Sequence, residues 1–466
     1  MAEHDLFAVS ADWVMPIEAP PINNGWVVID SGIVEFVGSQ LPAMFHSAKR
    51  YSLNDYAILP GLINSHCHLE FSDLQQPILA GDSFANWIGN LLAHRRLQSN
   101  CLDQKASTRR AAIASGIRES YAAGVRWIVD MTTQPWENEW IEMAVADMLS
   151  DLCPAFVPHA PIITQPCVEI LDIAKSRLAE TLAFACKQLG APESPLIGEM
   201  GYAPHAPYTT SWMATELCVE LSNANQRLVT MHLGESADEI AWLEHQQGGF
   251  RDLLGPVLGD DYFKGLGQIS KHFELLTQAP KSLIAHGNYL SERNIKQLAE
   301  RSQTMAIVHC PRTHRHFGHR HFGHRHEDSQ QYPLSERQSL GVRHLLGTDS
   351  RASNPDLNLW SEAKQVRADH PSIASESILK MITLDAAEFL GIDERYGAIR
   401  KGAPALLTAI KLASDCPPSE RSNGLERAYD IVLNPATESA PLELVLSGIA
   451  GPVVVDSRSY CENPGN

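Results

Sequence analysis

The sequence predicts an α/β fold: a (β/α)₈ (TIM) barrel with a small β-sandwich domain formed by the N- and C-terminal segments. Three observations predict it. Between about Leu59 and Leu390, short apolar segments typical of buried parallel strands alternate with helical patterns. These segments number eight, as a barrel requires. The flanking parts instead have the short, turn-separated segments of antiparallel strands.

The first flanking part contains a hairpin signature. Residues 25–30 and 33–38 are rich in strand-forming residues and surround a turn at Ser31-Gly32. After Gly397 the pattern becomes β-like again, so we expect the two ends of the chain to pair. The predicted domains are therefore 1–58 and 396–466 for the two parts of the β-sandwich and 59–395 for the barrel.

Side chains far apart in the sequence are expected to meet at one face of the barrel. The carboxyl ends of all barrel strands lie at that face, where such barrels place their active sites. After the first strand, Ser83 is suited to cap a helix whose apolar stripe includes Phe84, Trp87 and Leu91. The expected strand ends are His68, Thr132, His159, His205, His232, His286, His309 and Asp349.

Composition excludes several classes of partner. The formal net charge of −18 argues against nucleic acid and anionic membranes. No stretch is long enough for a transmembrane helix, and the N-terminus lacks the pattern of a signal peptide. The nine cysteines have no paired spacing, which is typical of reduced thiols in the cytoplasm. We expect a cytoplasmic protein, as a monomer or a homodimer.

Five residues at or near these strand ends are candidate metal ligands. Residues i and i+2 of a strand face the same way, so His66 and His68 can both point at one ion while Cys67 packs in the barrel. Imidazole and carboxylate groups suit Zn²⁺, with Fe²⁺ as an alternative. The five candidates are His66, His68, His232, His286 and Asp349.

A histidine-rich repeat follows the seventh predicted strand. The five residues His-Arg-His-Phe-Gly at 314–318 recur at 319–323, and His-Arg-His follows at 324–326. One interpretation is a tandem duplication that lengthened a loop over the active-site face. The other is a second, weak metal site, or a cationic clamp on an anionic substrate.

The motif PGLINSHCH at residues 60–68 resembles the amidohydrolase superfamily, and the resemblance covers nearly the whole chain. It includes the closing signature GAIRKG at residues 397–402. Superfamily members usually follow this signature with Ala-Asp, where this chain has Pro404-Ala405. That departure lies in the β domain and leaves the chemistry intact.

Four motifs are similar to the deaminase and chlorohydrolase branch: PHAPYT at 204–209, HLGES at 232–236, HCPR at 309–312 and GTDS at 347–350. Within it, HLEFS at 68–72 and SFANWI at 83–88 look most like aminodeoxyfutalosine deaminases, which act on an adenine nucleoside in menaquinone biosynthesis. Binuclear superfamily members carry a carboxylated lysine at the end of the fourth strand. Residues 197–210 contain no lysine, so the resemblance implies one metal ion.

The resemblance also implies roles. His66, His68, His232 and Asp349 would hold the ion, which lowers the pKa of its bound water. Asp349, or His286 beside it, would take the water proton, and the resulting hydroxide would attack the ring carbon that bears the amino group. Glu235 would protonate the adjacent ring nitrogen.

Four further residues are candidates for substrate binding, each with a structural alternative. His205 could contact substrate or pack beside two prolines, and Trp87 could stack on a purine or belong to the core. Glu70 could bind ribose hydroxyls or be a solvated carboxylate. Arg312 could bind a substrate carboxylate or form a surface salt bridge.

The leading hypothesis is a metal-dependent aminohydrolase of an adenine-type nucleoside such as aminodeoxyfutalosine. A second is a deaminase or chlorohydrolase of another heterocycle: adenosylhomocysteine or methylthioadenosine, guanine, or a triazine. A third is a non-catalytic metal-binding barrel. The complete ligand set and Glu235 argue against the third, since metal storage needs no proton donor.

Overall fold

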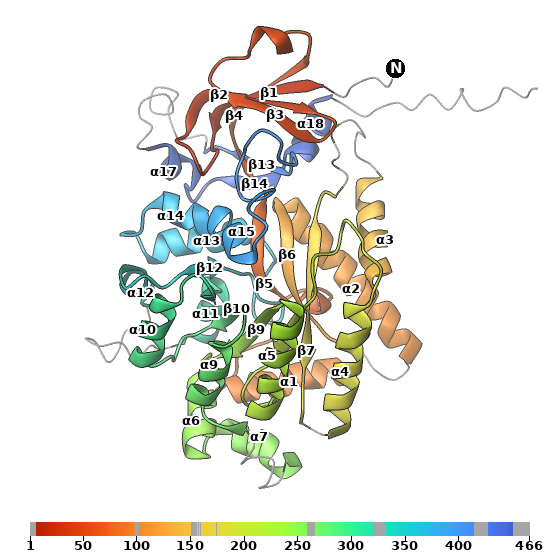
Figure 1. The fold of residues 1–466 in the computed structure, drawn as a ribbon, viewed down its shortest axis with the longest axis vertical. Coiled ribbons are helices and arrows are strands. Elements are labelled where there is room, and N and C mark those ends of the chain that lie inside the picture. The colour runs from red at the N-terminus through yellow and green to blue at the C-terminus, as the bar shows by residue number, and fades with distance from the viewer. Residues whose placement is uncertain are drawn as a thin grey trace, which may run out of the picture.

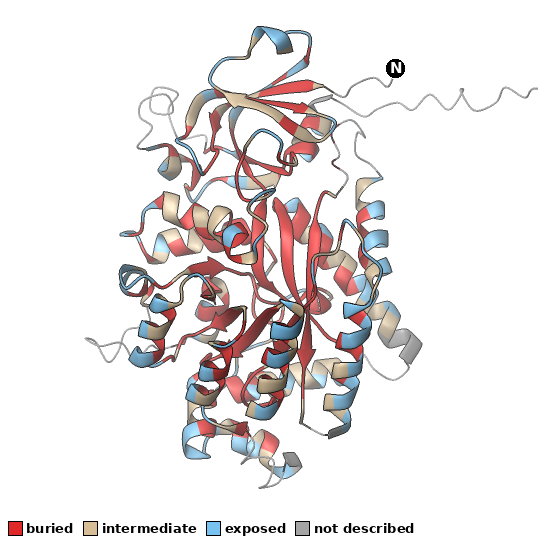
Figure 2. Ribbon diagram, viewed as in Figure 1, coloured by how far each residue is buried: buried red, intermediate tan, exposed pale blue. Residues whose placement is uncertain are grey.

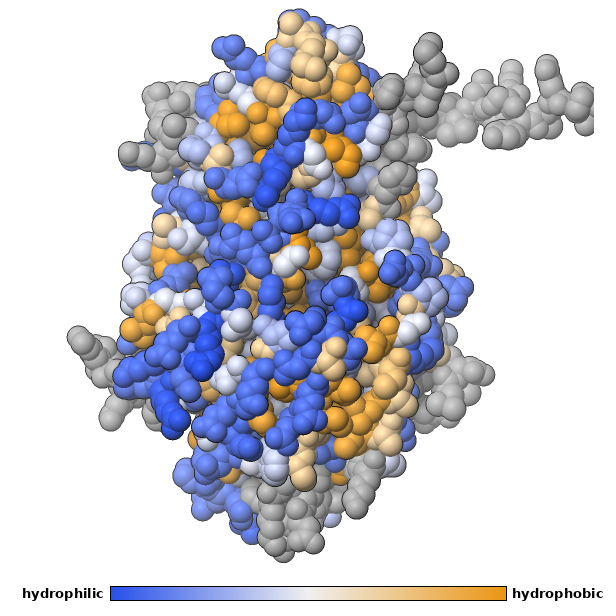
Figure 3. Space-filling view, viewed as in Figure 1, coloured by the Kyte–Doolittle hydropathy of each residue, from blue (hydrophilic) through white to orange (hydrophobic). Residues whose placement is uncertain are grey.

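The fold has two parts, a barrel and a smaller β domain (Figure 1). The computed structural model describes residues 6–97, 102–150, 156, 158, 160–173, 175–258, 266–319, 332–413 and 427–450. Hydrophilic side chains cover much of the face in Figure 3. Among the described residues, no helix is long and apolar enough to cross a membrane.

Eight parallel strands form the barrel, which confirms the predicted fold class. They are almost entirely buried, as near-continuous apolar runs predict (Figure 2). The sheet closes between its first and last strands, where the amide of Asp349 donates to the carbonyl oxygen of His66 at 3.0 Å. The strands are β5 (Leu62–Cys67), β6 (Val125–Thr132), β7 (Ile163–Ile170), β8 (Gly201–Pro204), β9 (Leu228–Leu233), β10 (Lys281–His286), β11 (Met305–His309) and β12 (His344–Leu346).

The third barrel strand is not where the sequence pattern predicted it. The expected end, His159, lies outside the described residues, and the strand is Ile163–Ile170. Its sequence, ITQPCVEI, includes Gln165, Pro166 and Glu169, so it lacks the continuous apolar run used to find buried strands. The observed strand brings Glu169 to the active-site face.

Helices surround the barrel, with buried faces toward the strands and exposed faces outward (Figure 2). The predicted cap is present, since Ser83 Oγ accepts a hydrogen bond from the amide of Asn86 at 3.1 Å. The helices up to β10 are α1 (Phe84–Leu97), α2 (Leu102–Ala122), α3 (Asn138–Leu149), α4 (Lys175–Leu189), α5 (Trp212–Asn225), α6 (Ala237–His245), α7 (Gly249–Leu258) and α9 (Ile269–Leu276), with short 3₁₀ turns η1 (Ala43–Phe45) and η2 (Leu69–Phe71).

The first copy of the histidine-rich repeat is helical, although the sequence suggested a loop. It forms the end of α11 (Pro311–Phe317), which starts with a proline at its first turn and stops at Gly318 in the left-handed conformation. Residues 320–331 lie outside the described part. The remaining helices are α10 (Glu292–Glu300), α12 (Leu334–Ser339), α13 (Leu359–Asp369), α14 (Ser375–Met381), α15 (Leu384–Leu390), α17 (Ala428–Val432) and α18 (Leu442–Ala450).

Both ends of the chain build the second sheet, as predicted. It has six strands in the order β14-β13-β4-β1-β2-β3, and β2 and β3 form the expected hairpin. Gly61 is the one residue between strand β4 of this sheet and strand β5 of the barrel. A Cβ atom added to Gly61 would lie 2.0 Å from Cγ of Arg126, so a larger residue does not fit there. The strands are β1 (Phe7–Val14), β2 (Ile22–Asp30), β3 (Ile33–Gly38), β4 (Lys49–Pro60), β13 (Leu407–Lys411) and β14 (Glu438–Pro441).

A buried ion pair joins the two parts. Arg126 on β6 donates from both terminal nitrogens to the carboxylate of Glu443 on α18, at 2.7 and 2.6 Å. Tyr121 donates to the same carboxylate at 2.8 Å. Because losing one partner of a buried pair is costly, this contact favours a fixed position of the β domain behind the barrel.

Candidate active site

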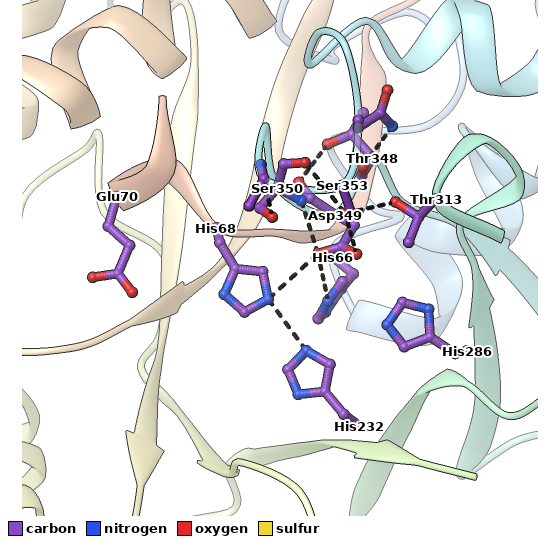
Figure 4. A network of polar contacts seen from close by, with 12 residues as sticks. His66, His68, Glu70, His232, His286, Thr313, Thr348, Asp349, Ser350 and Ser353 are labelled. Carbon is purple, nitrogen blue, oxygen red and sulfur yellow. Dashed lines mark hydrogen bonds and ion pairs between the residues drawn. The ribbon is translucent and has the colours of Figure 1, made fainter. Parts of the chain in front are cut away.

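The carboxyl ends of the barrel strands bring together all five residues predicted as ligand candidates (Figure 4). Nε2 of His68 lies 3.2 Å from Nε2 of His232 and 3.7 Å from Oδ1 of Asp349. Nε2 of His66 lies 3.9 Å from the same oxygen. The rings of His66 and His286 have centroids 5.7 Å apart, and all five side chains are buried.

Unusual backbone conformations aim two of these side chains. His286 and Asp349 both have positive φ, at 67° and 57°, which is uncommon for residues other than glycine. Each directly ends or follows a barrel strand, so the chain turns sharply there. Such strained positions persist only where the surrounding structure fixes them, and they gather at functional sites.

The histidines are neutral. Burial, followed by the neighbouring His232 and His68, lowers the pKa of His66 well below its usual value. Burial likewise lowers the pKa of His68 and His286, and it lowers the pKa of His232 to about 4. A neutral imidazole has one nitrogen lone pair, which is the form that binds a metal ion.

Hydrogen bonding in the cluster fits a divalent transition metal. Nδ1 of His232 lies 2.9 Å from the carbonyl oxygen of His205, so Nδ1 carries the proton and Nε2 carries the lone pair. Among the described residues, neither ring nitrogen of His66 nor Nε2 of His286 has a hydrogen-bond partner. Buried polar atoms are normally paired, and a cation between these lone pairs would satisfy them.

Two groups of three side chains have ligand atoms that all lie within 4.8 Å of one another. They are His66, His232 and His286, and His66, His68 and Asp349. The carboxylate of Asp349 is oriented by the amide of Ser350 at 2.7 Å and by Ser353 Oγ at 2.9 Å. Burial raises the pKa of Asp349 to about 6.

Glu235 lies beside this cluster as a potential proton donor. Its Oε1 is 3.5 Å from Nε2 of His286. Burial, with the charges of Asp349 and Glu239, raises the pKa of Glu235 well above its usual value, which favours the protonated form of the carboxyl group. Its backbone is fixed, because its amide donates to Glu239 at 2.7 Å and Asn288 donates to its carbonyl oxygen at 2.9 Å.

A cavity of about 290 Å³ opens onto the cluster and Glu235. Its outer wall is the apolar stripe of α1, which includes Phe84, Trp87 and Leu91. Trp87 also packs, since its ring stacks on Phe84 at 5.6 Å and its Nε1 donates to the carbonyl oxygen of Ala352 at 3.2 Å. Trp87 is therefore packed in the core and also lines the cavity, so core packing and stacking on a purine are compatible roles for this residue.

His205 also lines the cavity. Its Nδ1 is 2.6 Å from Thr209 Oγ1, and burial lowers the pKa of His205 to about 3. The ring is therefore neutral, with one nitrogen held by Thr209. This geometry is compatible with the predicted substrate contact.

Glu70 is not among the residues that line the cavity, and Figure 4 shows it to one side of the histidines. Its carboxylate pairs with Arg95 and with Arg109, the latter at 2.8 Å, and accepts from Thr133 at 2.7 Å. Burial alone would raise the pKa of Glu70, but the two arginines hold it below its usual value. The structure therefore favours a paired structural carboxylate over a ligand for ribose.

Arg312 also has partners within the protein. Its guanidinium pairs with Asp356 at 2.7 Å and with the fully buried Glu362 at 3.2 Å, and it is not among the residues that line the cavity. The geometry therefore favours the salt bridge, the structural alternative for this residue, over a contact with a substrate carboxylate.

Three charged cavity residues were missed: Arg95, Glu169 and Arg177. Arg95 follows Trp87 and Leu91 at intervals of four, so helical periodicity could have placed it on the same face. Glu169 was hidden by the misplaced third strand. Arg177, in the first turns of α4, carries no signal in the sequence.

Comparison with known proteins shows the family of the chain. The sequence matches the amidohydrolase family over residues 57–439. A 5-methylthioadenosine/S-adenosylhomocysteine deaminase of Pyrococcus furiosus is 27% identical over 394 residues, 83% of this chain and 82% of the relative. An aminodeoxyfutalosine deaminase of Nitratiruptor sp. is 23% identical over 365 residues, 76% of this chain and 79% of the relative.

The fold resembles a crystal structure of Helicobacter pylori aminofutalosine deaminase in complex with methylthio-coformycin. The TM-score is 0.74 at 19% identity, and the match covers 93% of this chain and 97% of the other. Such a low identity supports the fold alone.

Removing one ligand candidate is expected to remove the metal. His68→Ala should reduce bound zinc or iron from about one equivalent per chain to near zero, since a catalytic zinc site typically has three protein ligands. Metal content after dialysis, measured by mass spectrometry, checks this result. The exposed His245→Ala is the matched control.

Both variants are best made with His321, His324 and His326 changed to asparagine, because a histidine-rich segment can bind metal adventitiously. If His68→Ala retains full metal content in this background, the assigned site is wrong.

Proposed function

Since the chain belongs to the amidohydrolase family, and is therefore a hydrolase of carbon–nitrogen bonds, we propose that it deaminates an adenine-type nucleoside. One observation carries the proposal. A buried carboxyl group with a raised pKa, Glu235, lines the same small cavity as His68, His232, His286 and Asp349. This combination suits hydrolysis of a ring carbon beside a basic ring nitrogen.

We assign His66, His68, His232 and Asp349 as the ligands of one divalent ion. Neutral imidazoles with a carboxylate suit Zn²⁺ best, with Fe²⁺ as the alternative. Such an ion supplies Lewis-acid activation of a water molecule at neutral pH.

The remaining steps belong to the side chains. Glu235 donates its proton to the ring nitrogen next to the carbon that bears the amino group, which makes that carbon electrophilic. Asp349, with a pKa of about 6, is ionised at neutral pH and can take a proton from the attacking water. His286, whose Nε2 lies 3.5 Å from Oε1 of Glu235, can hold or pass a proton. The amino group then leaves as ammonia, and a ring carbonyl replaces it.

The cavity walls suit a flat aromatic ring. Phe84, Trp87 and Tyr208 line it, and the Tyr208 ring stacks on Phe250 at 4.4 Å, which fixes its orientation. Aromatic and apolar walls bind a purine face and exclude bulk water, which strengthens the polar contacts at Glu235. His205 offers a ring nitrogen toward the same space.

Two arginines line the cavity and could receive an anionic substituent. Arg95 is already bound by Glu70. Arg177 is 42% exposed, and its pair with the exposed Glu180 is loose, at 3.4 Å. Exposed pairs contribute little, so Arg177 can exchange Glu180 for a substrate carboxylate. This geometry supports a carboxylated adenine nucleoside such as aminodeoxyfutalosine, and hence a role in menaquinone formation.

A second candidate is deamination of methylthioadenosine or adenosylhomocysteine, which the name of the Pyrococcus furiosus relative favours. Adenosylhomocysteine also carries a carboxylate, whereas methylthioadenosine has no anionic group. Guanine and chlorotriazine substrates need a similar metal centre but no contact for a sugar.

An ammonia-release assay across these substrates tests the function. We expect kcat/KM to be highest for aminodeoxyfutalosine or adenosylhomocysteine, lower for methylthioadenosine and adenosine, and lowest for guanine. Faster turnover of guanine or a chlorotriazine than of every adenine nucleoside would overturn the substrate class and leave the metal centre standing.

The proton donor is tested by Glu235→Gln. The amide preserves the shape of the side chain but has no acidic proton, so kcat should fall at least 100-fold, the lower range for general acid–base catalysis. Metal content should remain unchanged. Glu244→Gln, an exposed residue on α6, is the control. A Glu235→Gln enzyme within about tenfold of wild type would show that another group is the acid.

Arg177 is tested by comparing charged and uncharged substrates. Arg177→Ala should reduce kcat/KM for the carboxylated nucleoside by roughly 10- to 100-fold, the effect of losing a hydrogen bond to a charged group. Turnover of adenosine should change little. The exposed Arg293→Ala serves as the control. Equal losses on both substrates would remove Arg177 from the carboxylate site.

A further inference from the structure

Glu169, at the end of β7, is a buried residue that lines the cavity. The residue is 3% exposed, and its Oε1 has no hydrogen-bond partner within the described part of the chain. The nearest ring nitrogens, Nδ1 of His68 and Nε2 of His205, are each 3.9 Å from Oε1, beyond hydrogen-bond range. A buried acceptor left in this state is costly, so a donor from a bound molecule is expected.

The surrounding cations do not provide that donor. Arg95 and Arg109 both pair with Glu70, which also accepts from Thr133. Glu70 is thus satisfied by the protein, whereas the charges of Arg95 and Arg109 act on Glu169 only from a distance. The two carboxylates therefore differ in function although both are buried beside the same arginines.

A second metal ion is the obvious alternative, because Glu169, His205 and His232 have ligand atoms within 4.8 Å of one another. His232 cannot serve it. Its Nδ1 is bound to the carbonyl oxygen of His205, and its only lone pair faces the first cluster, 3.2 Å from Nε2 of His68. Glu169 and Nε2 of His205 remain, fewer than the three protein ligands of a typical catalytic zinc site.

The position of Glu169 indicates which part of a nucleoside reaches it. Glu235 follows β9, and β7, β8 and β9 are neighbours in the barrel. Two strand spacings separate the ends of β7 and β9, roughly 10 Å. If the reacting edge of the purine meets Glu235, the opposite end of the ring, which carries the sugar, points toward β7.

We propose that Glu169 is a specificity residue that accepts hydrogen bonds from the ribose hydroxyl groups of the substrate. A carboxylate has two acceptor oxygens and can receive two neighbouring hydroxyl donors at once. The enzyme would then select ribonucleosides over deoxyribonucleosides and free bases. The inference rests on the proposed function, since it requires an adenine nucleoside in the cavity.

Four substrates that differ only in the sugar test the proposal: adenosine, 2′-deoxyadenosine, 3′-deoxyadenosine and 9-methyladenine. Wild-type enzyme should prefer adenosine over at least one deoxynucleoside by roughly 10- to 100-fold in kcat/KM, the value of a hydrogen bond to a charged group. Glu169→Ala should lose that factor on adenosine and change less than about threefold on 9-methyladenine, so the preference disappears.

Two controls separate this role from a structural one. Glu193→Ala removes an exposed carboxylate outside the cavity and should leave all four rates unchanged. Metal content of Glu169→Ala should equal that of wild type. If Glu169→Ala does not fold, the nearly isosteric Glu169→Gln should still reduce the preference for adenosine, because the uncharged amide is a weaker acceptor.

The outcomes are distinguishable. Equal losses on adenosine and 9-methyladenine, or loss of metal from Glu169→Ala, would overturn the ribose contact and assign Glu169 to support of His68. Wild-type turnover of adenosine with no preference for the ribose hydroxyls would also overturn it. Failure of the wild type to deaminate any adenine compound would instead reject the proposed function, and this inference with it.

Discussion

The active-site face depends on one electrostatic constraint, the convergence of several buried imidazole nitrogens and a carboxylate at one point, which a bound cation would satisfy. Nε2 of His68 and Nε2 of His232 lie 3.2 Å apart, and burial keeps both rings neutral. The barrel closes at this point, since the amide of Asp349 binds the carbonyl oxygen of His66. His66 and Asp349 therefore belong both to the closure of the barrel and to the cluster, and a bound ion would stabilise both.

Around this cluster, the carboxyl groups of Glu70, Asp349 and Glu235 have different properties because their environments differ. Two arginines and a threonine keep Glu70 ionised and structural. Asp349 accepts two hydrogen bonds and has a pKa of about 6, suited to taking a proton near neutral pH. Burial beside other carboxylates raises the pKa of Glu235 well above its usual range, which suits a proton donor. Pairs of carboxyl groups with separated pKa values are typical of acid–base catalysis.

The sequence predicted the barrel, the hairpin and the paired termini, because each depends on local apolar periodicity. Ligand candidates were found for the same reason: each lies where an apolar run stops. The third strand was missed because Gln165, Pro166 and Glu169 interrupt its pattern, and Glu169 was missed with it. The ion pairs of Arg312 were not predicted because its partners, Asp356 and Glu362, lie 44 and 50 residues further along the chain. Ion pairs between residues far apart in the sequence produce no local pattern from which they could be predicted.

Substrate choice must lie in the walls of the cavity. The histidines and Asp349 come from strand ends, whose positions the barrel fixes, whereas the walls come from α1 and α4, which follow strands and vary with loop structure. A similar fold at 19% identity to an aminofutalosine deaminase is consistent with this division, since the fold persists while most side chains differ. Under the proposed function, the contacts of the walls with the purine would be apolar and tolerant. Charged residues such as Glu169 on β7 and Arg177 on α4 would discriminate more strongly, because a buried or semi-buried charge left without its partner costs more than an apolar mismatch.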